Sequence, residues 1–154
     1  MTERVVVTYP ATREDLAMVA DILAGVGEVV RLPPPEDPAR RGVLGEAVAL
    51  LSSHPDRELS EADWAEAPKV RLLQTTTAGL DHITFDRLPP SVVVAGNVGA
   101  YAAPMAEHTL ALVLGLAKRL VVAHTELAHG RFDQQTPSRM LTGRTAVILG
   151  YGGI

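Results

Sequence analysis

The stretch of this chain that says most about the expected fold is its last one, LTGRTAVILGYGGI, residues 141–154. Within it, Thr145 to Leu149 is a short apolar run of the kind that forms a buried parallel strand. Three glycines, Gly150, Gly152 and Gly153, follow this run directly. A glycine turn after a strand opens a dinucleotide-binding βαβ unit, because glycine permits the tight turn and the close approach of a pyrophosphate. The pattern therefore predicts cofactor contacts at these three glycines.

The same glycines also have a simpler interpretation, because many strands end in a glycine turn that binds nothing. The sequence stops at Ile154, before a helix and before an acidic residue that could bind a ribose. We therefore expect a nucleotide-binding unit that begins here without being completed. The chain alone is not expected to bind the cofactor.

Composition excludes several classes of function. The 154 residues carry 14 basic and 18 acidic side chains without clusters, which argues against a nucleic acid or an anionic membrane as partner. The absence of cysteine excludes a disulfide scaffold and a thiolate metal site. The longest strongly apolar stretch, Thr109 to Ala117, has about half the length that a bilayer span requires. We expect a soluble, cytoplasmic protein.

Short apolar runs alternate with helical patterns in the first part of the chain. Strands are predicted over 4–9, 27–32, 47–51, 70–74 and 92–95, the third of which could also be helical. Thr12 with Asp15, and Ser60 with Asp63, have the spacing of helix N-caps. Three consecutive prolines predict a surface loop over 33–42. This alternation indicates a parallel α/β sheet with right-handed crossovers.

A long helix is predicted from about Ala103 to His129. Its large apolar side chains cover most of the helix circumference: Leu110, Leu112, Val113, Leu114, Leu116, Leu120, Val121 and Val122. Burying each contributes about 1.5–3 kcal/mol, so exposing all of them forfeits as much as the net stability of a domain, about 5–15 kcal/mol. We therefore expect a cover for this helix from beyond the first domain. Gly130 to Met140 has no core pattern and resembles an arm.

Three segments, in this order, resemble the D-isomer-specific 2-hydroxyacid dehydrogenase family, which includes phosphoglycerate, glyoxylate and formate dehydrogenases. They are LLQTTTAGLDHI at 72–83, NVGAYAAPMAEHTLALVLGLAKRL at 97–120 and LTGRTAVILGYGGI at 141–154. The resemblance is to the N-terminal part of the family and covers nearly the whole chain. It implies an oxidoreductase that uses NAD or NADP to move a hydride to or from C2 of a 2-hydroxy or 2-keto acid.

The resemblance also implies a division into two domains. Residues 1–96 would form a flavodoxin-like substrate domain, and residues 97–154 would begin a Rossmann domain with the long helix, the arm and the first strand. In the family, helix and arm supply much of a dimer interface, so we expect a homodimer through residues 103–140. The family's catalytic arginine, carboxylate and histidine lie far beyond position 154. No catalytic residue is therefore assigned here, and the chain alone is expected to be inactive.

Substrate contacts are expected in the small-residue turn formed by Thr77, Ala78, Gly79 and Leu80. Exposed backbone N–H groups at a helix N-terminus can bind a carboxylate, and the family uses this segment for the carboxylate of its substrate. The alternative is a simple turn in which Asp81 only caps a helix.

Asn97 and Tyr101 complete the expected substrate site. The amide of Asn97 could hydrogen-bond a carbonyl or carboxylate, and the formate-oxidising branch of the family uses an asparagine in a similar segment. A turn asparagine before Gly99 is an equally good interpretation. Tyr101 lies where some relatives place a tyrosine that touches the substrate.

The remaining ionisable residues predict neither a catalytic pair nor a metal site. Glu107 and His108 diverge by about 100° on a helix, so they cannot act on one atom, and a structural role at the domain hinge is expected. His124 and His129 are poorly spaced for one helical face. The other two histidines of interest, His54 and His82, are expected in loops.

Two other functions remain open. The chain could be a non-catalytic interaction module whose apolar helix pairs with itself or with a longer relative. A signalling receiver on a flavodoxin-like sheet agrees less well, because the first strand ends in Tyr9 and Pro10 without an acidic pair for magnesium.

Overall fold

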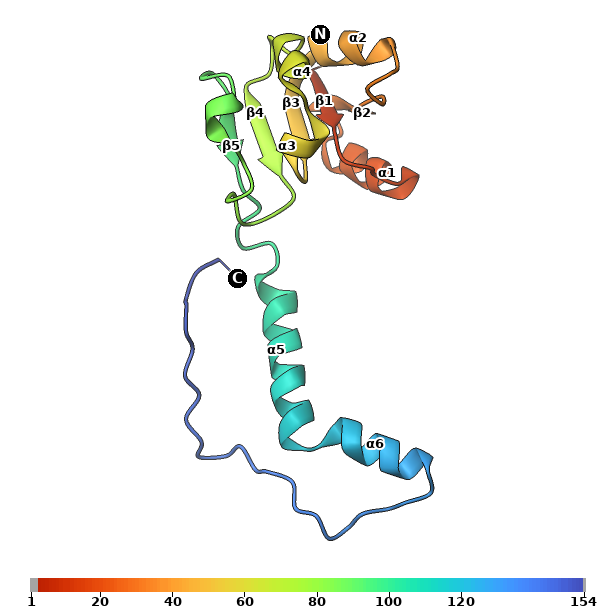
Figure 1. The fold of residues 1–154 in the computed structure, drawn as a ribbon, viewed down its shortest axis with the longest axis vertical. Coiled ribbons are helices and arrows are strands. Elements are labelled where there is room, and N and C mark those ends of the chain that lie inside the picture. Colours follow the sequence, from red (N-terminus) through yellow and green to blue (C-terminus); the bar gives the residue numbers. More distant parts are fainter. Residues whose placement is uncertain (1–2, 154) are drawn as a thin grey trace. The chain divides into compact units, whose positions relative to one another are not determined.

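The computed structural model describes residues 3–153, so Met1, Thr2 and Ile154, the last residue of the glycine motif, lie outside the described part. The chain divides into two compact units between Val98 and Gly99. The first unit contains a five-stranded sheet with short helices, and the second contains two helices followed by an irregular segment (Figure 1).

The sheet of the first unit is parallel throughout and has the strand order β2-β1-β3-β4-β5. Its strands are β1 (Glu3–Val7), β2 (Gly27–Arg31), β3 (Ala47–Ser52), β4 (Leu72–Thr75) and β5 (Val93–Ala95). In register, Val5 lies opposite Val29 on one side and Ala49 on the other. The predicted parallel α/β fold is confirmed, and the ambiguous run at 47–51 is a strand.

Helices α1 (Arg13–Ile22) and α4 (Glu61–Ala65) begin with the predicted caps. Thr12 Oγ1 accepts a hydrogen bond from the Asp15 N–H at 3.1 Å, and Asp15 Oδ2 accepts one from the Thr12 N–H at 2.8 Å. Ser60 and Asp63 make the same reciprocal pair. Each pair satisfies two N–H groups that a helix start leaves open. Two shorter elements are α3 (Pro55–Glu58) and the 3₁₀ helix η1 (Phe85–Arg87).

The prediction of a loop over 33–42 is wrong at its end, because helix α2 spans Ala39–Gly45. Leu44 and Arg40 of this helix are both buried. Arg40 donates hydrogen bonds to both carboxylate oxygens of Asp63, at 2.7 and 3.0 Å, and to the Pro33 carbonyl oxygen at 2.6 Å. Contacts with residues distant in the sequence therefore stabilise a helix that the proline-rich local pattern does not predict.

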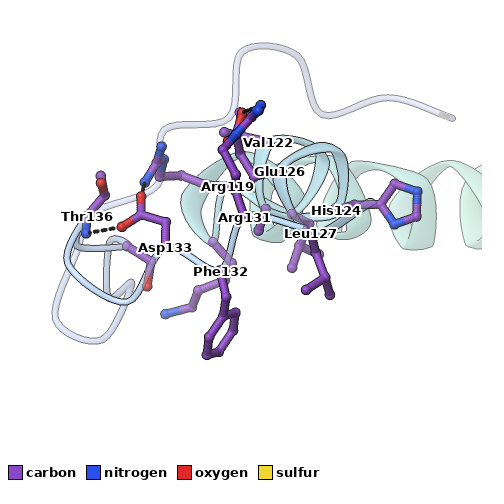
Figure 2. A pocket seen from close by; sticks show the side chains of 13 residues that line it. Arg119, Val122, His124, Glu126, Leu127, Arg131, Phe132, Asp133 and Thr136 are labelled. Carbon is purple, nitrogen blue, oxygen red and sulfur yellow. Dashed lines mark hydrogen bonds and ion pairs between the residues drawn. The ribbon is translucent and has the colours of Figure 1, made fainter. Parts of the chain in front are cut away.

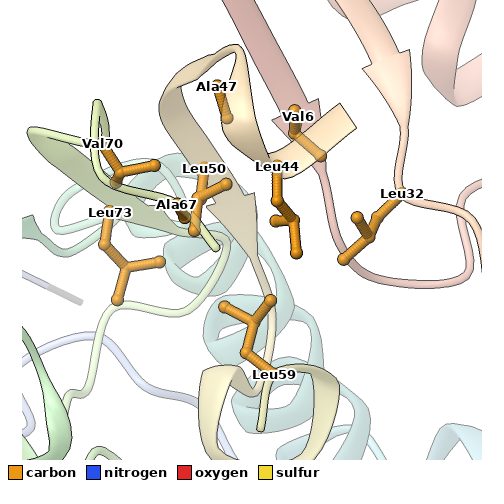
Figure 3. Close-up of a cluster of buried hydrophobic side chains, with 9 residues drawn as sticks. All are labelled: Val6, Leu32, Leu44, Ala47, Leu50, Leu59, Ala67, Val70 and Leu73. Carbon is orange, nitrogen blue, oxygen red and sulfur yellow. The ribbon is translucent and has the colours of Figure 1, made fainter. Parts of the chain in front are cut away.

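The core of the first unit lies on one face of the sheet (Figure 3). It consists of Val6, Leu32, Leu44, Ala47, Leu50, Leu59, Ala67, Val70 and Leu73. Leu50 and Leu73 are register partners on adjacent strands, and the half-buried Trp64 packs against the cluster. On the opposite face, Leu72 and Val93 are also register partners, and both are exposed. The core therefore holds β1, β3 and β4 together from one side.

The predicted single helix over 103–129 is wrong, because two helices occupy this range: α5 (Ala102–Ala117) and α6 (Leu120–Ala128). Arg119, between them, has φ of 54°, a left-handed conformation through which an α-helix cannot continue. Lys118 Nζ donates a hydrogen bond to the Arg139 carbonyl at 2.9 Å, and the Arg139 N–H donates one to the Ala117 carbonyl at 2.8 Å. A later segment thus satisfies the end of α5 in place of another helical turn.

Most large apolar side chains of the two helices are exposed to solvent. Leu116 and Val121 are 80% and 77% exposed, and Ala117 is the one buried residue that α5 and α6 contain. Neither of these helices, nor any other in the described part of the chain, combines the length and the apolar character that a membrane span requires.

The strand predicted at Thr145–Leu149 is not formed. Val147, Ile148 and Leu149 are 87%, 75% and 101% exposed, and residues 131–153 contain no helix or strand. A parallel strand needs the N–H and C=O groups of a neighbouring strand. The described residues of the second unit contain no such neighbour, so the apolar run stays in solvent.

Candidate functional site

Hydroxyl and amide side chains gather where the strands of the sheet end. Thr8 follows β1, Ser53 follows β3, Thr76 and Thr77 follow β4, and Asn97 follows β5. Because all strands are parallel, their carboxyl ends lie at one edge, where open α/β sheets bind their ligands.

Glu58 joins the ends of β1 and β3 at this edge. Its carboxylate accepts hydrogen bonds from Thr8 Oγ1 at 2.5 Å, Ser52 Oγ at 2.7 Å and the His54 N–H at 2.8 Å. The strand order reverses between β1 and β3, and such switch points are the usual ligand crevice of doubly wound sheets. Here the side chain of Glu58 occupies the space between the ends of β1 and β3.

The predicted carboxylate turn, residues 77–80, follows β4. Thr75 Oγ1 donates a hydrogen bond to the Thr77 carbonyl at 2.7 Å, and Thr77 Oγ1 donates one to the Gly79 carbonyl at 3.0 Å. Within residues 3–153, the N–H groups of Ala78, Gly79 and Leu80 donate no hydrogen bond to protein. The turn therefore leaves three consecutive backbone N–H donors that an anion could use.

No helix begins at this turn, so the predicted helix N-terminus is wrong. The next element is η1, whose N-cap is Thr84, and Asp81 therefore caps no helix either. Instead, Gly79 lies close to Asp81, since a Cβ at Gly79 would be 3.3 Å from Asp81 Oδ2. An anion at this turn would bind beside the Asp81 carboxylate, so the backbone N–H groups would have to hold it against that charge and without the assistance of a helix dipole.

Asn97 is brought against the same turn. Its N–H donates a hydrogen bond to the Thr77 carbonyl at 2.9 Å, and its Nδ2 donates one to the Thr76 carbonyl at 3.3 Å. Glycine at position 96 suits this close approach, because a Cβ there would make a tight contact, 3.0 Å, with the Ala78 carbonyl oxygen. The structure therefore brings Asn97 together with residues 77–80.

Tyr101 and the glycine turn belong to the second unit. Tyr101 precedes α5 and is 45% exposed. Gly150 has φ of 90°, which suits glycine, and nothing lies within 4 Å of a Cβ built on it or on Gly152. Residues 131–153, which include this turn, contain no helix or strand.

His54 and His82, expected as separate loop residues, are neighbours in space. Their ring centroids are 5.0 Å apart, and His82 Nε2 lies 3.1 Å from the Ser53 carbonyl oxygen. Beside them, the Thr84 N–H donates a hydrogen bond to Asp56 Oδ2 at 3.0 Å. These contacts join the loop after β3 to the loop that carries the turn.

The sequence shows no signal for this pair of loops, because its members are 28 residues apart and meet only when β3 pairs with β4. In the part of the chain that the structure describes, no group of three His, Cys, Asp or Glu side chains could hold a metal ion.

A cavity of about 430 Å³ in the second unit lies between α6 and the segment after it (Figure 2). Arg119 lies 3.6 Å from Asp133, and Arg131 forms an ion pair with Glu126. Hydrogen bonds from Thr136, and then from the Gln135 N–H, lower the pKa of Asp133 to about 2. The arginines and carboxylates of this cavity thus pair with one another, and Lys118, which also lines it, donates a hydrogen bond to the Arg139 carbonyl.

Comparison with known proteins gives relatives that are longer than this chain. No protein-family model matches it. A glyoxylate reductase from Thermofilum pendens is 26% identical over 130 residues, which are 79% of this chain and 37% of that protein. A formate dehydrogenase from Neurospora crassa is 29% identical over 96 residues, 58% of this chain and 26% of that protein. The chain therefore spans well under half of the length of these curated relatives.

Solved structures show a similar fold in the same family of dehydrogenases. A D-isomer-specific 2-hydroxyacid dehydrogenase family protein from Aeromonas salmonicida matches with a TM-score of 0.67 and 17% identity, over 94% of this chain and 44% of that one. In sequence and in fold, this chain is similar to the N-terminal part of the D-isomer-specific 2-hydroxyacid dehydrogenases.

Proposed function

We propose that residues 1–96 are the substrate domain of an NAD- or NADP-dependent D-2-hydroxyacid dehydrogenase, and that residues 97–154 begin its nucleotide-binding domain. The whole enzyme would move a hydride between nicotinamide and C2 of a small 2-hydroxy or 2-keto acid in the cytoplasm. The similarity to a glyoxylate reductase over 79% of the chain supports this assignment. Substrates of this class share a carboxylate, for which the first unit offers a suitable anion site.

The free N–H groups of Ala78, Gly79 and Leu80 are the observation that carries the proposal. A carboxylate that accepts hydrogen bonds from these donors would be bound without a cationic side chain. Asn97, hydrogen-bonded to both Thr76 and Thr77, would contribute its amide to the same substrate. Tyr101 would be a further contact in the assembled enzyme.

Catalysis would depend on residues that this chain lacks. Arg119, Glu126 and His129 do not match the family's catalytic motifs, and each has a local partner. Arg119 pairs with Asp133, Glu126 pairs with Arg131, and His129 Nδ1 lies 2.8 Å from the Thr125 carbonyl oxygen. Gly150, Gly152 and Gly153 would approach a cofactor only with a strand and a helix built around them. We therefore expect residues 1–154 to bind small carboxylates without oxidising NADH.

The proposal is tested by titrating the ¹⁵N-labelled chain with glyoxylate. We expect the largest chemical-shift changes at the amides of residues 78–80 and at the side chain of Asn97. Gly96→Ala should weaken binding about tenfold or more, because its Cβ would press on the Ala78 carbonyl, 3.0 Å away. Gly42→Ala is the matched control, since a Cβ at Gly42 has nothing within 4 Å. Shifts centred away from the turn would contradict the proposed site.

An activity assay tests the second part. The 154-residue chain should show no NADH oxidation above a blank with glyoxylate, pyruvate or hydroxypyruvate. Clear turnover would show that the catalytic groups are present after all.

An interaction module is the second candidate, and the exposed apolar side chains of α5 and α6 favour it. We propose that residues 103–140 pair with a second copy of the chain. Leu116→Glu should then shift the chain towards monomer in sedimentation velocity, because it places a charge in the contact. Ile22→Glu is the matched control, since Ile22 is 72% exposed on α1 of the first unit. A wild-type chain that stays monomeric as its concentration rises would exclude the pairing.

A further inference from the structure

A groove of about 520 Å³ lies beside the carboxyl ends of β1 and β2. Thr8, directly after β1, and Arg31, the last residue of β2, line it from the sheet. Its volume is within the range of small-molecule sites, about 300–1,000 Å³. Neither the turn at 77–80 nor Asn97 lines this groove, so it is separate from the proposed substrate site.

Two of the charged side chains in the groove are already hydrogen-bonded within the protein. Arg40 donates to Asp63, to the Pro33 carbonyl and to the Glu58 carbonyl. The Glu58 carboxylate accepts from Thr8, Ser52 and the His54 N–H. Both groups line the groove, and a ligand could use them only by breaking these hydrogen bonds.

Arg31 and Arg57 are different, because both are exposed and neither guanidinium has a hydrogen-bond or ion-pair partner within residues 3–153. Asp63 neutralises the charge of Arg40. The two positive charges of Arg31 and Arg57 then outweigh the single negative charge of Glu58, so the groove carries a net positive charge. A guanidinium is a planar donor fork that matches a phosphate or a carboxylate.

One side of the groove is apolar and rigid. Pro33, Pro34 and Pro35 line it, together with Leu32 and Pro10. Proline loses almost no side-chain entropy when a ligand packs against it, and its ring fixes the backbone φ. A flat apolar group could therefore lie on this wall at little entropic cost.

We propose that this groove binds a small anionic molecule, with a phosphate or carboxylate group held by Arg31 and Arg57 and a flat apolar part against Pro33–Pro35. The site does not depend on the proposed dehydrogenase function, because it lies at other strand ends and uses other residues. It is a second ligand site on the first unit.

The test is a set of NMR titrations of the whole chain with three probes. Phenyl phosphate carries both a phosphate and a ring, benzoate carries a carboxylate and a ring, and inorganic phosphate has no ring. We expect phenyl phosphate to shift the Nε–Hε signals of Arg31 and Arg57 and the amides near residue 32. Its affinity should exceed that of inorganic phosphate, because only phenyl phosphate can use the proline wall.

Variants separate this site from general attraction of anions. Arg31→Gln combined with Arg57→Gln should weaken phenyl phosphate binding about tenfold or more. Arg71→Gln is the matched control, because Arg71 precedes β4 at the amino edge of the sheet and the substitution removes the same charge. It should leave the affinity within about twofold.

Each outcome decides the proposal. Stronger binding of benzoate than of phenyl phosphate would support the site and identify its anion as a carboxylate, and the reverse order would identify a phosphate. Equal affinity for phenyl phosphate and inorganic phosphate would overturn the apolar wall. An equal loss in Arg71→Gln, or shifts confined to residues 78–80, would overturn the groove as a site, and the second result would leave the proposed substrate turn intact.

Discussion

Similar apolar residues are buried in the first unit of this chain and exposed in the second. In the first unit, Leu50 and Leu73 are almost completely buried between paired strands and the helices that cover them. In the second unit, Leu112 and Leu116 are 54% and 80% exposed on α5, a helix of 16 residues. The residue type is the same in both, so burial depends on whether a packing neighbour is present. The comparison shows that the first unit is stabilised by its own core, whereas α5 presents an apolar surface.

The largest expected effect compares a leucine from each unit. Leu73→Ala should lower the free energy of unfolding by about 4 kcal/mol, because it leaves a cavity in a packed core. In the monomeric chain, Leu112→Ala should change it by no more than about 0.5 kcal/mol, since little packing is lost at an exposed site. Urea unfolding measures both, with fluorescence of Trp64, the one tryptophan, for the first unit and helical circular dichroism for α5. A loss above about 2 kcal/mol for Leu112→Ala would mean that its side chain is covered in solution.

A smaller difference is expected between the two arginine–carboxylate pairs. The side chains of Arg40 and Asp63 are 10% and 13% exposed, and Arg40→Leu should destabilise the first unit by about 3 kcal/mol because it leaves a buried carboxylate without its partner. The Arg131–Glu126 pair is 62% and 34% exposed, so Arg131→Leu should leave the unfolding curve unchanged. Thermal unfolding of both variants checks this contrast. Equal shifts in their midpoints would refute it.

The smallest expected effect is on stability at acid pH, and it distinguishes two aspartates, Asp63 and Asp133. The pKa of each is lowered to about 2. Hydrogen bonds from Arg40, and then from Ser60, lower the pKa of Asp63 against the effect of burial, whereas Thr136 and Gln135 lower that of Asp133 in an exposed turn. A carboxyl group whose pKa is lower in the folded state stabilises it above the unfolded pKa, about 3.9, and loses this effect as the pH falls towards the folded pKa. The first unit should therefore become less stable between about pH 4 and pH 2.

Asp63→Asn should remove this part of the acid dependence. Asp133→Asn should leave the acid unfolding of the first unit unchanged and shift only the amide signals of residues 135 and 136, whose N–H groups bond to Asp133. Acid titrations followed by Trp64 fluorescence and by NMR distinguish the two variants. An unchanged acid transition in Asp63→Asn would show that other groups control it.

Local patterns in the sequence predict the five strands of the sheet and the starts of α1 and α4 well. The reciprocal caps at Thr12 and Ser60 involve residues three positions apart, so their geometry follows from the sequence spacing. The helix α2 was missed, because its stability depends on Arg40 reaching Asp63 across 23 residues. The break at Arg119 was missed for the same reason, since Arg139 provides the contacts that end α5.

The candidate site divides in the same way. The turn at 77–80 can be read from its small residues and its place after a strand, and Asn97 from its place after the next one. The role of Glu58 at the β1–β3 switch point and the contact between His54 and His82 require the pairing of β3 with its neighbours. No spacing in the sequence indicates them.

The sequence by itself therefore determined the parallel α/β class, the positions of the strands and caps, and the turn that offers its N–H groups. These features depend on residues close together along the chain, whose conformations are set by local sterics and hydrogen bonds. Tertiary structure alone decided that Glu58 occupies the switch point, that the helix breaks at Arg119, and that the apolar run at 145–149 stays exposed. Each of these depends on a distant hydrogen-bond partner being present or missing, which local sequence cannot specify.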